Sequence, residues 1–522
     1  MKRTISFILG ICIHLTVLAV TQVSIPDPDT WRYTDLKKYI GQTVQFDVPF
    51  YVCNNYNSIT ISPRRTYSPT NQALPLSAEY NSILSLNSQG SVTLTGVSGY
   101  HRLGERLHNL TVKVNSQTSV SLVSCDWRGN TRKELEKGVD LEAINMRGEH
   151  TLLVCCMNLE YYLVENLGSG SMGPKTREAH QKQRAKVSKA LAKINADLYG
   201  FVEIEQGQRA LAEIANDLTQ NTGRKFSYVD DGGSASGTYT KSGFVYCSDM
   251  LQPYGNLREN NTGVKERKKT QAFQENSTGE KFLFSVNHFK AKSGKGSGDN
   301  ADQDDGQGTY NGDRVREARS LLSHYENDSY YFDDDDILIM GDLNAYAMED
   351  PITVLREGGM IDLHRAFHAD SSYSYVYRGQ AGYLDHALCN STLYPHVTGM
   401  VAYHINSDES DSYTYDKSSD QTMFRCSDHD PVLVGLRLDS VHTTTPDEVV
   451  PEMSINFRDF VPYIHNAEGG AYMLYLPSGH KITPRPITIL SNEEPITGLQ
   501  QGLYIVNVYG QGTCLQTKIM VK

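Results

Sequence analysis

After its first 20 residues, the sequence has no hydrophobic run of the roughly 20 residues that a membrane-spanning helix needs. It also lacks a repeat of fixed period and the glycine or proline bias of collagens and disordered chains. A membrane bundle, a solenoid and a fibrous protein are therefore excluded. The chain of 522 residues, 39% hydrophobic and 21% charged, is typical of a globular protein with about three domains. We expect a monomer without an integral membrane segment in the mature chain.

Cysteine is scarce, with nine residues in the whole chain. None stands in a C-x-x-C spacing, so the pattern does not indicate a zinc site. Cys155 and Cys156 lie in an apolar, strand-like run, where we expect buried free thiols. The other cysteines permit disulfides if the chain is exported, because such bonds form outside the cytoplasm. The sequence assigns no pairing.

Positive charge is also in short supply. The formal net charge is −12, and loss of Lys2 and Arg3 with a leader would remove two positive charges and give −14. This balance argues against a protein that holds nucleic acid by bulk charge. It leaves open an enzyme that meets phosphate through a bound metal ion and a local basic surface.

The N-terminus predicts a secretory leader over residues 1–22. Lys2 and Arg3 precede an apolar run from Ile5 to Val20, and the chain turns polar at Thr21. An uncleaved anchor and a buried helix are the alternatives. A lipid anchor is disfavoured because Ile11 stands before Cys12, where a small residue would be needed. We expect a secreted or cell-surface protein, with the periplasm as the other location.

The two ends of the mature chain are expected to be β-rich. Residues 23–148 contain alternating runs at 44–48, 92–97 and 110–114, separated by Asn-, Ser-, Pro- and Gly-containing stretches. They predict an all-β domain, either an oligonucleotide/oligosaccharide-binding (OB-like) barrel or a β-domain that only packs on its neighbour. Residues 441–522 begin with a linker at 443–448 and continue with strands near 472–476, 503–508 and 518–521, which predict a small β-sandwich.

Residues 149–440 show an α/β pattern. The continuous apolar run at 152–157 is typical of a buried strand, and a helix is predicted over 176–195 because Val187, Leu191 and Ile194 share one face. Further strands are expected at 198–202, 244–247, 282–286, 337–340 and 431–438. Together they predict sheets covered by helices.

Polar residues suited to metal or phosphate chemistry stand next to five of these strands. They are Asn158, Glu203, Asn287, His288, Asp342, Asn344, Asp428 and His429. If the strands share an edge, these side chains converge there, which is the usual place for a site in such folds. Asp342 and Asn344 are two residues apart in extended chain and project to one side. Each residue alone could equally end a strand or cap a turn.

The middle region resembles the endonuclease/exonuclease/phosphatase superfamily, which includes pancreatic deoxyribonuclease (DNase I) and the abasic-site endonucleases, and it is most similar to secreted bacterial nucleases. The matching segments are 200–205 (GFVEIE), 286–292 (VNHFKAK), 301–308 (ADQDDGQG), 341–346 (GDLNAY), 349–352 (EDPI), 380–387 (QAGYLDHA) and 427–432 (SDHDPV). The resemblance implies a DNase I-like four-layer α/β/β/α sandwich. The tail resembles C-terminal sorting modules of exported Bacteroidetes proteins, with a plain accessory β-sandwich as the alternative.

The resemblance also implies a role for each matching residue. Glu203, Asn158 and Asp428 are expected to bind a divalent cation, Mg²⁺ first and Mn²⁺ or Ca²⁺ otherwise, because their donors are oxygens. His429 is expected to act as general base, oriented by Asp385, while Asp342 positions the attacking water. Asn344 and His288 would contact the phosphate or the leaving oxygen. Asn287, Lys290 and Lys292 complete the expected substrate-binding set.

Three features stand beside this set. The loop Asp299–Asp305 carries four aspartates and could hold a structural Ca²⁺, although such a run is more often a solvated surface. The stretch 267–271 (RKKTQ) could widen a basic strip next to the site. Glu160, Glu165 and Glu205 are expected to be solvated or structural.

The main hypothesis is a hydrolase that cleaves phosphodiesters in nucleic acid, DNA before RNA. One alternative keeps the chemistry with another substrate, as a phosphatase or lipid phosphodiesterase. The other is a non-catalytic surface binding protein. A basic groove beside His288 would favour nucleic acid, whereas an apolar collar would favour lipid.

Overall fold

The structure is a computed structural model that describes residues 20–438, except 57, 169–171, 233–238, 261 and 369–370. It also describes residues 454–521, except 459–460, 468–470, 477–481, 484–486, 492 and 511–512. Most of the predicted leader, residues 1–19, and the predicted linker at 443–448 lie outside the described residues. Among the described residues, no helix has the length and apolar character needed to span a bilayer.

The N-terminal region contains a closed β-barrel. Its strands are β1 (Val20–Val23), β2 (Thr43–Phe46), β3 (Phe50–Asn54), β4 (Ile59–Ser62), β5 (Val92–Thr95), β6 (Arg106–Ser116) and β7 (Ser119–Arg128). The pairings β3–β4, β4–β5, β5–β7, β7–β6 and β6–β3 form a ring, in which only β5–β7 is parallel. A five-stranded ring of this kind is consistent with the OB-like alternative. The last residues of the predicted leader, 20–22, belong to β1, which pairs with β2.

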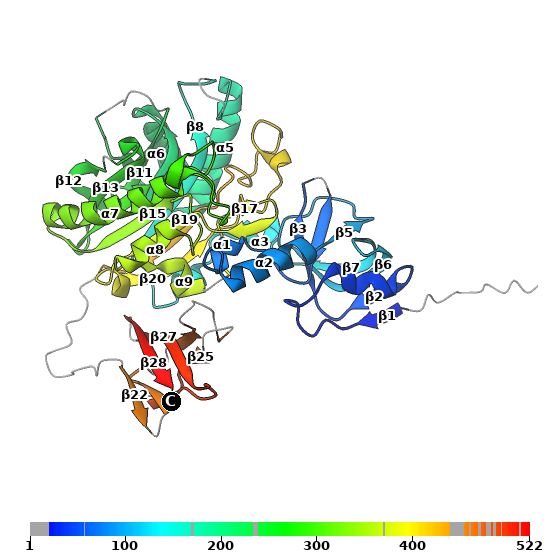
Figure 1. Cartoon of the computed structure of the whole chain (residues 1–522). Helices are drawn as coiled ribbons and strands as arrows, with labels where there is room; N and C mark the ends of the chain where they lie inside the picture. Colours follow the sequence, from blue (N-terminus) through cyan, green and yellow to red (C-terminus); the bar gives the residue numbers. More distant parts are fainter. Residues whose placement is uncertain are drawn as a thin grey trace, which may run out of the picture.

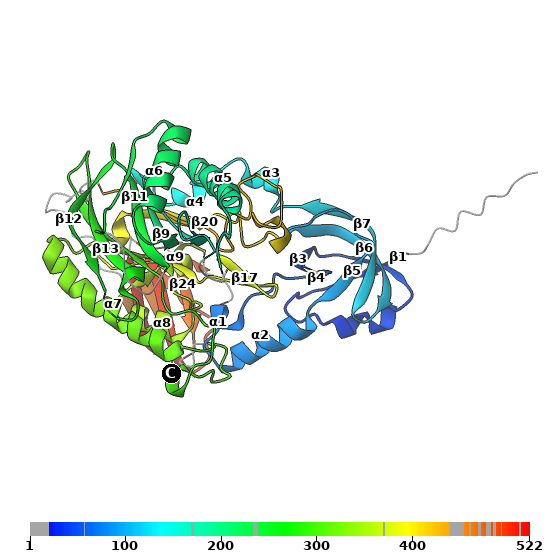
Figure 2. The ribbon, with the colours of Figure 1, turned by 90° about the horizontal axis from the view of Figure 1, so that it is seen from above.

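Two short helices were not predicted in this region, α1 (Pro69–Gln72) and α2 (Ala78–Gln89). Ser77 caps α2, since its side chain accepts a hydrogen bond from the Tyr80 backbone N–H. The region ends with α3 (Arg132–Leu135) and α4 (Leu141–Ile144). In Figure 2, α1 and α2 extend from the barrel toward the central domain.

The central domain is built on two six-stranded sheets. The first sheet runs in the order β10 (Phe226–Tyr228), β11 (Thr240–Cys247), β9 (Leu198–Glu205), β8 (Leu152–Tyr162), β21 (Val432–Leu436) and β20 (Val397–Ala402). The second runs β12 (Leu251–Glu259), β13 (Lys268–Glu275), β14 (Lys281–Asn287), β15 (Ile337–Asp342), β19 (Asp385–Cys389) and β16 (Ile361–Asp362). A separate hairpin joins β17 (Tyr375–Tyr377) to β18 (Gln380–Gly382).

The helices of this domain cover the outer faces of the sheets (Figure 1). They are α5 (Arg177–Ile194), α6 (Arg209–Thr222), α7 (Asn311–Phe332), α8 (Asp350–Glu357) and α9 (Leu363–His368). Short 3-10 helices lie in this domain at Lys265–Arg267, Gly298–Asn300, Tyr394–His396 and Asp411–Tyr413, and in the barrel region at Tyr33–Tyr39. The predicted helix over 176–195 is confirmed as α5.

Alternation along β8 explains the four layers. Leu152, Val154 and Cys156 pack against side chains of the second sheet. The intervening residues, such as Leu153 and Cys155, pack against α5 and α6. Because successive side chains of a strand point to opposite faces, a strand buried on both faces reads as one apolar run. A separate core joins the second sheet to α7 and α8. The predicted α/β/β/α sandwich is therefore confirmed.

The C-terminal strands form two small sheets around a core of their own. These strands are β22 (Ser454–Arg458), β23 (Val461–His465), β26 (Glu493–Pro495), β25 (Ile487–Thr488), β24 (Ala471–Tyr475), β27 (Gly502–Gly510) and β28 (Thr513–Val521). Ile464 of the first sheet and Val506 of the second share this core, as expected of a β-sandwich.

Seven cysteines of the described region are free, including the buried Cys155 and Cys156.

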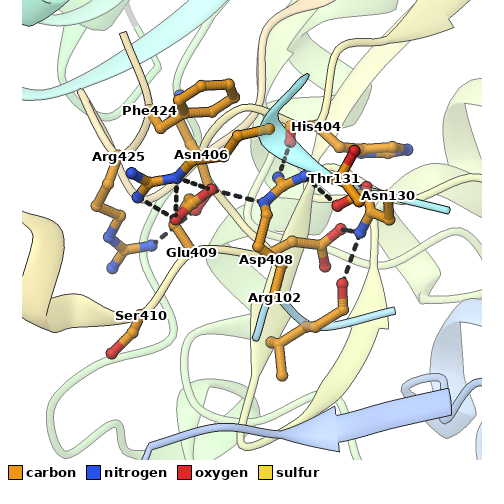
Figure 3. Close-up of polar contacts among 12 residues, drawn as sticks. Arg102, Asn130, Thr131, His404, Asn406, Asp408, Glu409, Ser410, Phe424 and Arg425 are labelled. Carbon is orange, nitrogen blue, oxygen red and sulfur yellow. Dashed lines mark hydrogen bonds and ion pairs between the residues drawn. The ribbon is translucent and has the colours of Figure 1, made fainter. Parts of the chain in front are cut away.

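Buried ion pairs join the barrel region to the central domain. We call Arg65, Arg102, Arg132, Asp408 and Glu409 the arginine–carboxylate cluster. Arg65 Nη2 lies 2.5 Å from Asp408 Oδ1, and Arg102 Nε lies 2.6 Å from Glu409 Oε1, with neither carboxylate exposed. Figure 3 shows Arg102 between Glu409, the backbone oxygen of His404 and Asn130. The cluster fixes the barrel region to the loop at 404–411.

Candidate active site

The predicted site residues meet where the two sheets come together, around the carboxylate of Asp342. Asn158 Nδ2 donates to Asp342 Oδ2 at 3.2 Å. His288 Nε2 lies 3.7 Å from that same oxygen and 3.8 Å from Glu203 Oε1. His429 Nε2 lies 3.9 Å from Asp342 Oδ2. The first sheet thus supplies Asn158 and Glu203, and the second sheet supplies Asp342 and His288.

The backbone at Gly341 brings Asp342 into this position. Gly341 has a φ of +130°, and a Cβ there would lie 2.0 Å from the backbone oxygen of Asn287. Only glycine fits, so the chain can leave β15 sharply. Asp342 Oδ1 then accepts a hydrogen bond from the Asn344 backbone N–H at 2.9 Å, and Asn344 Nδ2 donates to the Phe289 backbone oxygen at 3.1 Å. These bonds fix Asn344 beside Asp342, but Asn344 has a φ of +50°, so the two residues are not in the extended chain that the prediction assumed.

His429 is held by a buried carboxylate and an aromatic ring. Its Nδ1 lies 2.7 Å from Asp385 Oδ2, which also accepts a hydrogen bond from Ser374 Oγ at 2.7 Å. The Tyr375 ring stacks on the imidazole with the centroids 4.5 Å apart. Nε2 of His429 is thereby directed toward Asp342. Ser374 and Tyr375 were not predicted as site residues, because they stand in a Ser/Tyr-rich segment with no motif to mark them.

Several carboxyl groups lie close together in this site, and their pKa values are raised. Burial, reinforced by the charges of Asp428 and Asp342, raises the pKa of Glu203 to about 8. Burial also raises the pKa of Asp342 to about 7, with Asp385 adding to the rise and His429 opposing it. The pKa of Glu160 is raised to about 8 by burial and by Asp428. Glu160 therefore lies in the electrostatic field of Asp428, and its being solvated or structural rather than catalytic stays a prediction.

The two histidines are driven in opposite directions. Burial, together with Arg267 and His429, lowers the pKa of His288 well below its ordinary value, so this imidazole is neutral. Burial alone would also lower the pKa of His429, but the charges of Asp385, Asp428 and Asp342 raise it well above its ordinary value. Opposite shifts of two neighbouring groups are typical of an acid–base site.

The residues fit a divalent cation that keeps part of its water shell. The described residues contain no group of three or more His, Cys, Asp or Glu side chains placed to hold a metal by themselves. Glu203 and Asp428 supply two carboxylates, while the Asn158 amide oxygen already accepts the Glu160 backbone N–H at 2.9 Å. Mg²⁺ is commonly bound through one or two carboxylates plus water and substrate phosphate. Burial and the negative charges of Asp428 and Asp342 raise the pKa of Glu203, and a bound cation would offset both effects.

A cationic pocket of about 220 Å³ adjoins His288. Arg267, Lys290 and Arg316 line it together with Asp313, which pairs with Arg316, and Glu317, which pairs with Lys268. Nε of Arg267 is buried without a hydrogen-bond partner in the described part of the chain. Lys290 Nζ lies 4.2 Å from the centroid of the Tyr310 ring. Arg267 and Lys290 are therefore placed to receive an anion next to His288.

Lys268 and Lys269 do not widen the basic strip, contrary to the expectation for 267–271. Both are buried, and they form ion pairs with Glu317 and Asp231 respectively. Strand alternation cannot expose them, because the second sheet is covered on both faces. The basic residues do lie at the start of β13. Of Arg267, Lys268 and Lys269, however, Arg267 alone faces the site.

Two expected substrate-binding residues are also engaged elsewhere. Asn287 is fully buried, and its Nδ2 donates to Ser285 Oγ at 2.9 Å. Lys292 Nζ lies 2.5 and 2.7 Å from the two oxygens of the buried Glu349. Both residues support the strand and loop below the site. Of the expected set, Lys290 lines the pocket.

The predicted Ca²⁺ loop receives no support. Asp299 forms an ion pair with Arg316, Asp302 accepts the Asp304 backbone N–H, and Asp305 accepts from Gln307. Their carboxylates are used in separate local contacts and do not converge. Glu205 is structural as expected, since it accepts backbone N–H groups from Val164, Glu165 and Asn166.

The comparison with protein families matches residues 165–429 to the Endonuclease/Exonuclease/phosphatase family. The chain belongs to the endonuclease/exonuclease/phosphatase family. Membership in this family makes it an enzyme that hydrolyses phosphate ester bonds, and the alternative of a non-catalytic binding protein is set aside. Members are generally dependent on a divalent metal. Comparison with curated proteins found no match.

Solved structures similar to this family member share little sequence with it. An endonuclease/exonuclease/phosphatase family protein from Bacteroides thetaiotaomicron is 17% identical, with 56% of this chain and 96% of that chain covered and a TM-score of 0.37. The mannosyl-6-phosphatase Bt3783 of the same organism is 16% identical, with 55% and 100% covered and a TM-score of 0.37. D. rerio TDP2, complexed with a single-strand DNA product, is 14% identical, with 55% and 98% covered and a TM-score of 0.36.

Proposed function

We propose that this enzyme is a metal-dependent phosphodiesterase that hydrolyses nucleic acid, with DNA as the first expectation and RNA as the second. The observation that carries the proposal is the cationic pocket beside His288. Arg267 and Lys290 place positive charge next to the reacting position, while the acidic residues of the lining, Asp313 and Glu317, pair with Arg316 and Lys268. A nucleic acid places further phosphates on either side of the scissile one, and such phosphates are bound by arginine and lysine. A lipid substrate would instead call for an apolar collar there.

The side chains suggest how water would be activated. His429 Nε2 would take a proton from the attacking water while Asp385 stabilises the imidazolium through Nδ1. Asp342 would orient that water, and neutral His288 and Asn344 would donate hydrogen bonds to the phosphate. Glu203, Asn158 and Asp428 would hold a divalent cation, which polarises a phosphate oxygen. Since Asp428 helps to raise the pKa of His429, neutralising that carboxylate favours the unprotonated base.

The substrate class is tested with plasmid DNA, single-stranded DNA, RNA, sphingomyelin and p-nitrophenyl phosphate, each with Mg²⁺ or with EDTA. We expect hydrolysis of nucleic acid with Mg²⁺, little release of phosphate from the monoester, and no activity in EDTA. Hydrolysis confined to sphingomyelin or to the monoester would overturn the proposal.

Cation binding is expected to stabilise the protein more at high pH than at low pH. The carboxyls of Glu203 and Asp342 have raised pKa values, of about 8 and about 7, so the folded state keeps protons that the unfolded state releases. Without metal, stability therefore falls as pH rises from about 4.5 to about 8. Mg²⁺ competes with those protons, and the rise in Tm on adding Mg²⁺ should be larger at pH 8 than at pH 6.

The measurement is thermal unfolding in EDTA and in excess Mg²⁺ at both pH values. Glu203→Gln should remove most of the Mg²⁺-dependent rise, whereas Glu357→Gln, at an exposed position at the end of α8, should retain it. An unchanged response in Glu203→Gln would show that the cation binds elsewhere.

We also propose the organisation and location that the sequence indicates. Residues 23–148, 149–440 and 441–522 would act as three domains of a monomer, after export directed by residues 1–22. Analysis of the secreted chain by N-terminal sequencing and size-exclusion chromatography tests these points.

A further inference from the structure

A cleft of about 580 Å³ lies between the barrel and the central domain. Asn55 and Tyr56, which follow β3, line the side formed by the barrel. Tyr377 and Arg378, at the tip of the β17–β18 hairpin, line the other side together with Lys417. In Figures 1 and 2, β17 lies on the side of the central domain that faces the barrel. This volume is within the range of about 300–1,000 Å³ found for ligand-binding clefts.

One end of this cleft reaches the candidate active site. Asp428, an expected metal ligand, lines it, and so does Tyr375, whose ring stacks on His429. Glu160, whose backbone N–H binds Asn158, lines it as well. A ligand in the cleft would therefore be continuous with a phosphate held at His429.

The two walls of the cleft are fixed to one another. Gly379, in the hairpin turn, has a φ of +79°, and a Cβ there would lie 2.4 Å from the Cys53 backbone oxygen of β3. Thr66 Oγ1 donates to the Gly379 backbone oxygen at 2.6 Å. The arginine–carboxylate cluster joins the same two bodies through the loop at 404–411 (Figure 3). The cleft is preformed, which lowers the cost of ordering a ligand in it.

The rim of the cleft carries exposed rings and cations, whereas its acidic side chains lie deeper, where Glu409 is paired with Arg102 and Asp411 with Arg425. Tyr56 and Tyr377 are 66% and 53% exposed, and the Arg378 guanidinium lies 5.2 Å from the centroid of the Tyr377 ring. Arg378 and Lys417 are exposed cations at the rim. Deeper in the cleft, Arg425 is only 8% exposed and is already paired, since its Nη2 lies 2.5 Å from Asp411 Oδ1.

The lining distinguishes between forms of nucleic acid. Aromatic side chains stack on bases whose faces are free, and a cationic path beside them follows the backbone, which is the usual arrangement for binding single strands. In a duplex the base faces are covered by their neighbours and cannot reach Tyr56 or Tyr377. Tyr56 lies in the loop between β3 and β4, the first two strands of the five-stranded ring. In OB-fold barrels the corresponding loop is one of the regions that bind oligonucleotides.

We propose that this cleft binds unpaired nucleotides adjacent to the scissile phosphate, so that the barrel and the β17–β18 hairpin direct the enzyme to single-stranded nucleic acid. Tyr56 and Tyr377 stack on bases, while the exposed Arg378 and Lys417 contact the phosphates. This inference rests on the proposed function for its substrate class and adds the strand form and the binding residues.

The test measures binding apart from catalysis. In a His429→Ala background with Mg²⁺, the dissociation constant is measured by fluorescence anisotropy for a labelled 12-nucleotide single strand and for a hairpin duplex. Adding Tyr56→Ala and Tyr377→Ala together should weaken single-strand binding by about 10- to 100-fold and change duplex binding by less than about threefold. Tyr330→Ala, at a tyrosine of α7 that is 92% exposed, is the matched control and should change neither.

Catalysis supplies a second readout. With His429 intact, the paired tyrosine substitutions should leave hydrolysis of bis(p-nitrophenyl) phosphate unchanged and raise KM for single-stranded DNA. The proposal would be overturned if the paired tyrosine substitutions left single-strand binding unchanged or weakened single-strand and duplex binding equally. It would also be overturned if the substitutions lowered only the activity on sphingomyelin vesicles. Failure of the wild-type enzyme to cleave any nucleic acid would instead refute the proposed function, since the binding measurement needs no turnover.

Discussion

His429→Ala is expected to lower the rate of phosphodiester hydrolysis by about 10²- to 10⁴-fold, the usual contribution of a general base. Of the two imidazoles of the site, His429 is the one within hydrogen-bond distance of a buried carboxylate, since its Nδ1 lies 2.7 Å from Asp385 Oδ2, whereas His288 Nε2 lies 3.7 Å from Asp342 Oδ2. That contact orients Nε2 toward Asp342, where the attacking water would be held. Removal of the ring leaves Asp385 hydrogen-bonded to Ser374, so the carboxylate is not left without a partner. The fold should therefore persist.

The rate is measured with plasmid DNA and with bis(p-nitrophenyl) phosphate, and folding is followed by circular dichroism. Asp385→Asn should give a smaller loss in kcat, because the imidazole remains but its orientation and charge stabilisation weaken. His324→Ala, on the outer helix α7, should retain activity within about twofold. Wild-type turnover by folded His429→Ala would rule out the assigned base.

Most of the candidate site could be predicted from the sequence because its residues follow buried strands. Glu203 and Asp342 stand where an apolar run ends, and the strands of a sandwich must bring those ends to a common edge. Asn158 is a partial exception, since β8 continues to Tyr162. There the pairing with β9 shifts between Asn158 and Tyr162, and Glu160 and Tyr161 adopt positive φ values. Asn158 itself follows the alternation of Leu152, Val154 and Cys156 and so faces the second sheet, whereas no local pattern announces the irregularity that follows it.

What the sequence could not predict depends on contacts between distant segments. Lys292 was expected to face phosphate, but Glu349, 57 residues away, binds it. Lys268 was expected on a basic surface, but Glu317 of α7 buries it in an ion pair. Tyr375 gains its place on His429 only through the hairpin that packs against the barrel. Charge and spacing identify candidates, whereas their partners decide which candidates remain free to bind a substrate.

Arg102→Met is expected to destabilise the protein by about 2–4 kcal/mol, since each buried acceptor left without its donor costs about 1–3 kcal/mol. Arg102 is 1% exposed. It pairs with Glu409 and donates to the backbone oxygens of Asn130 and His404 (Figure 3). Without it, two buried carbonyls lose a donor, and Glu409 retains Arg132 as its cation. Methionine keeps much of the volume but supplies no donor.

The loss should reach the active site through the loop at 404–411. Asn406 in this loop donates to the His429 backbone oxygen at 2.7 Å, and Asp430 accepts its backbone N–H at 2.8 Å. Both tryptophans of the chain, Trp31 and Trp127, lie in the barrel region, so tryptophan fluorescence reports on the barrel while hydrolysis reports on the central domain. In urea, the two transitions should coincide for the wild type and separate for Arg102→Met, with activity lost at lower urea. Arg128→Met, at an exposed pair with Asp126, should shift neither transition by more than about 0.5 kcal/mol. Coincident, unshifted transitions in Arg102→Met would show that the cluster does not couple the barrel to the catalytic loop.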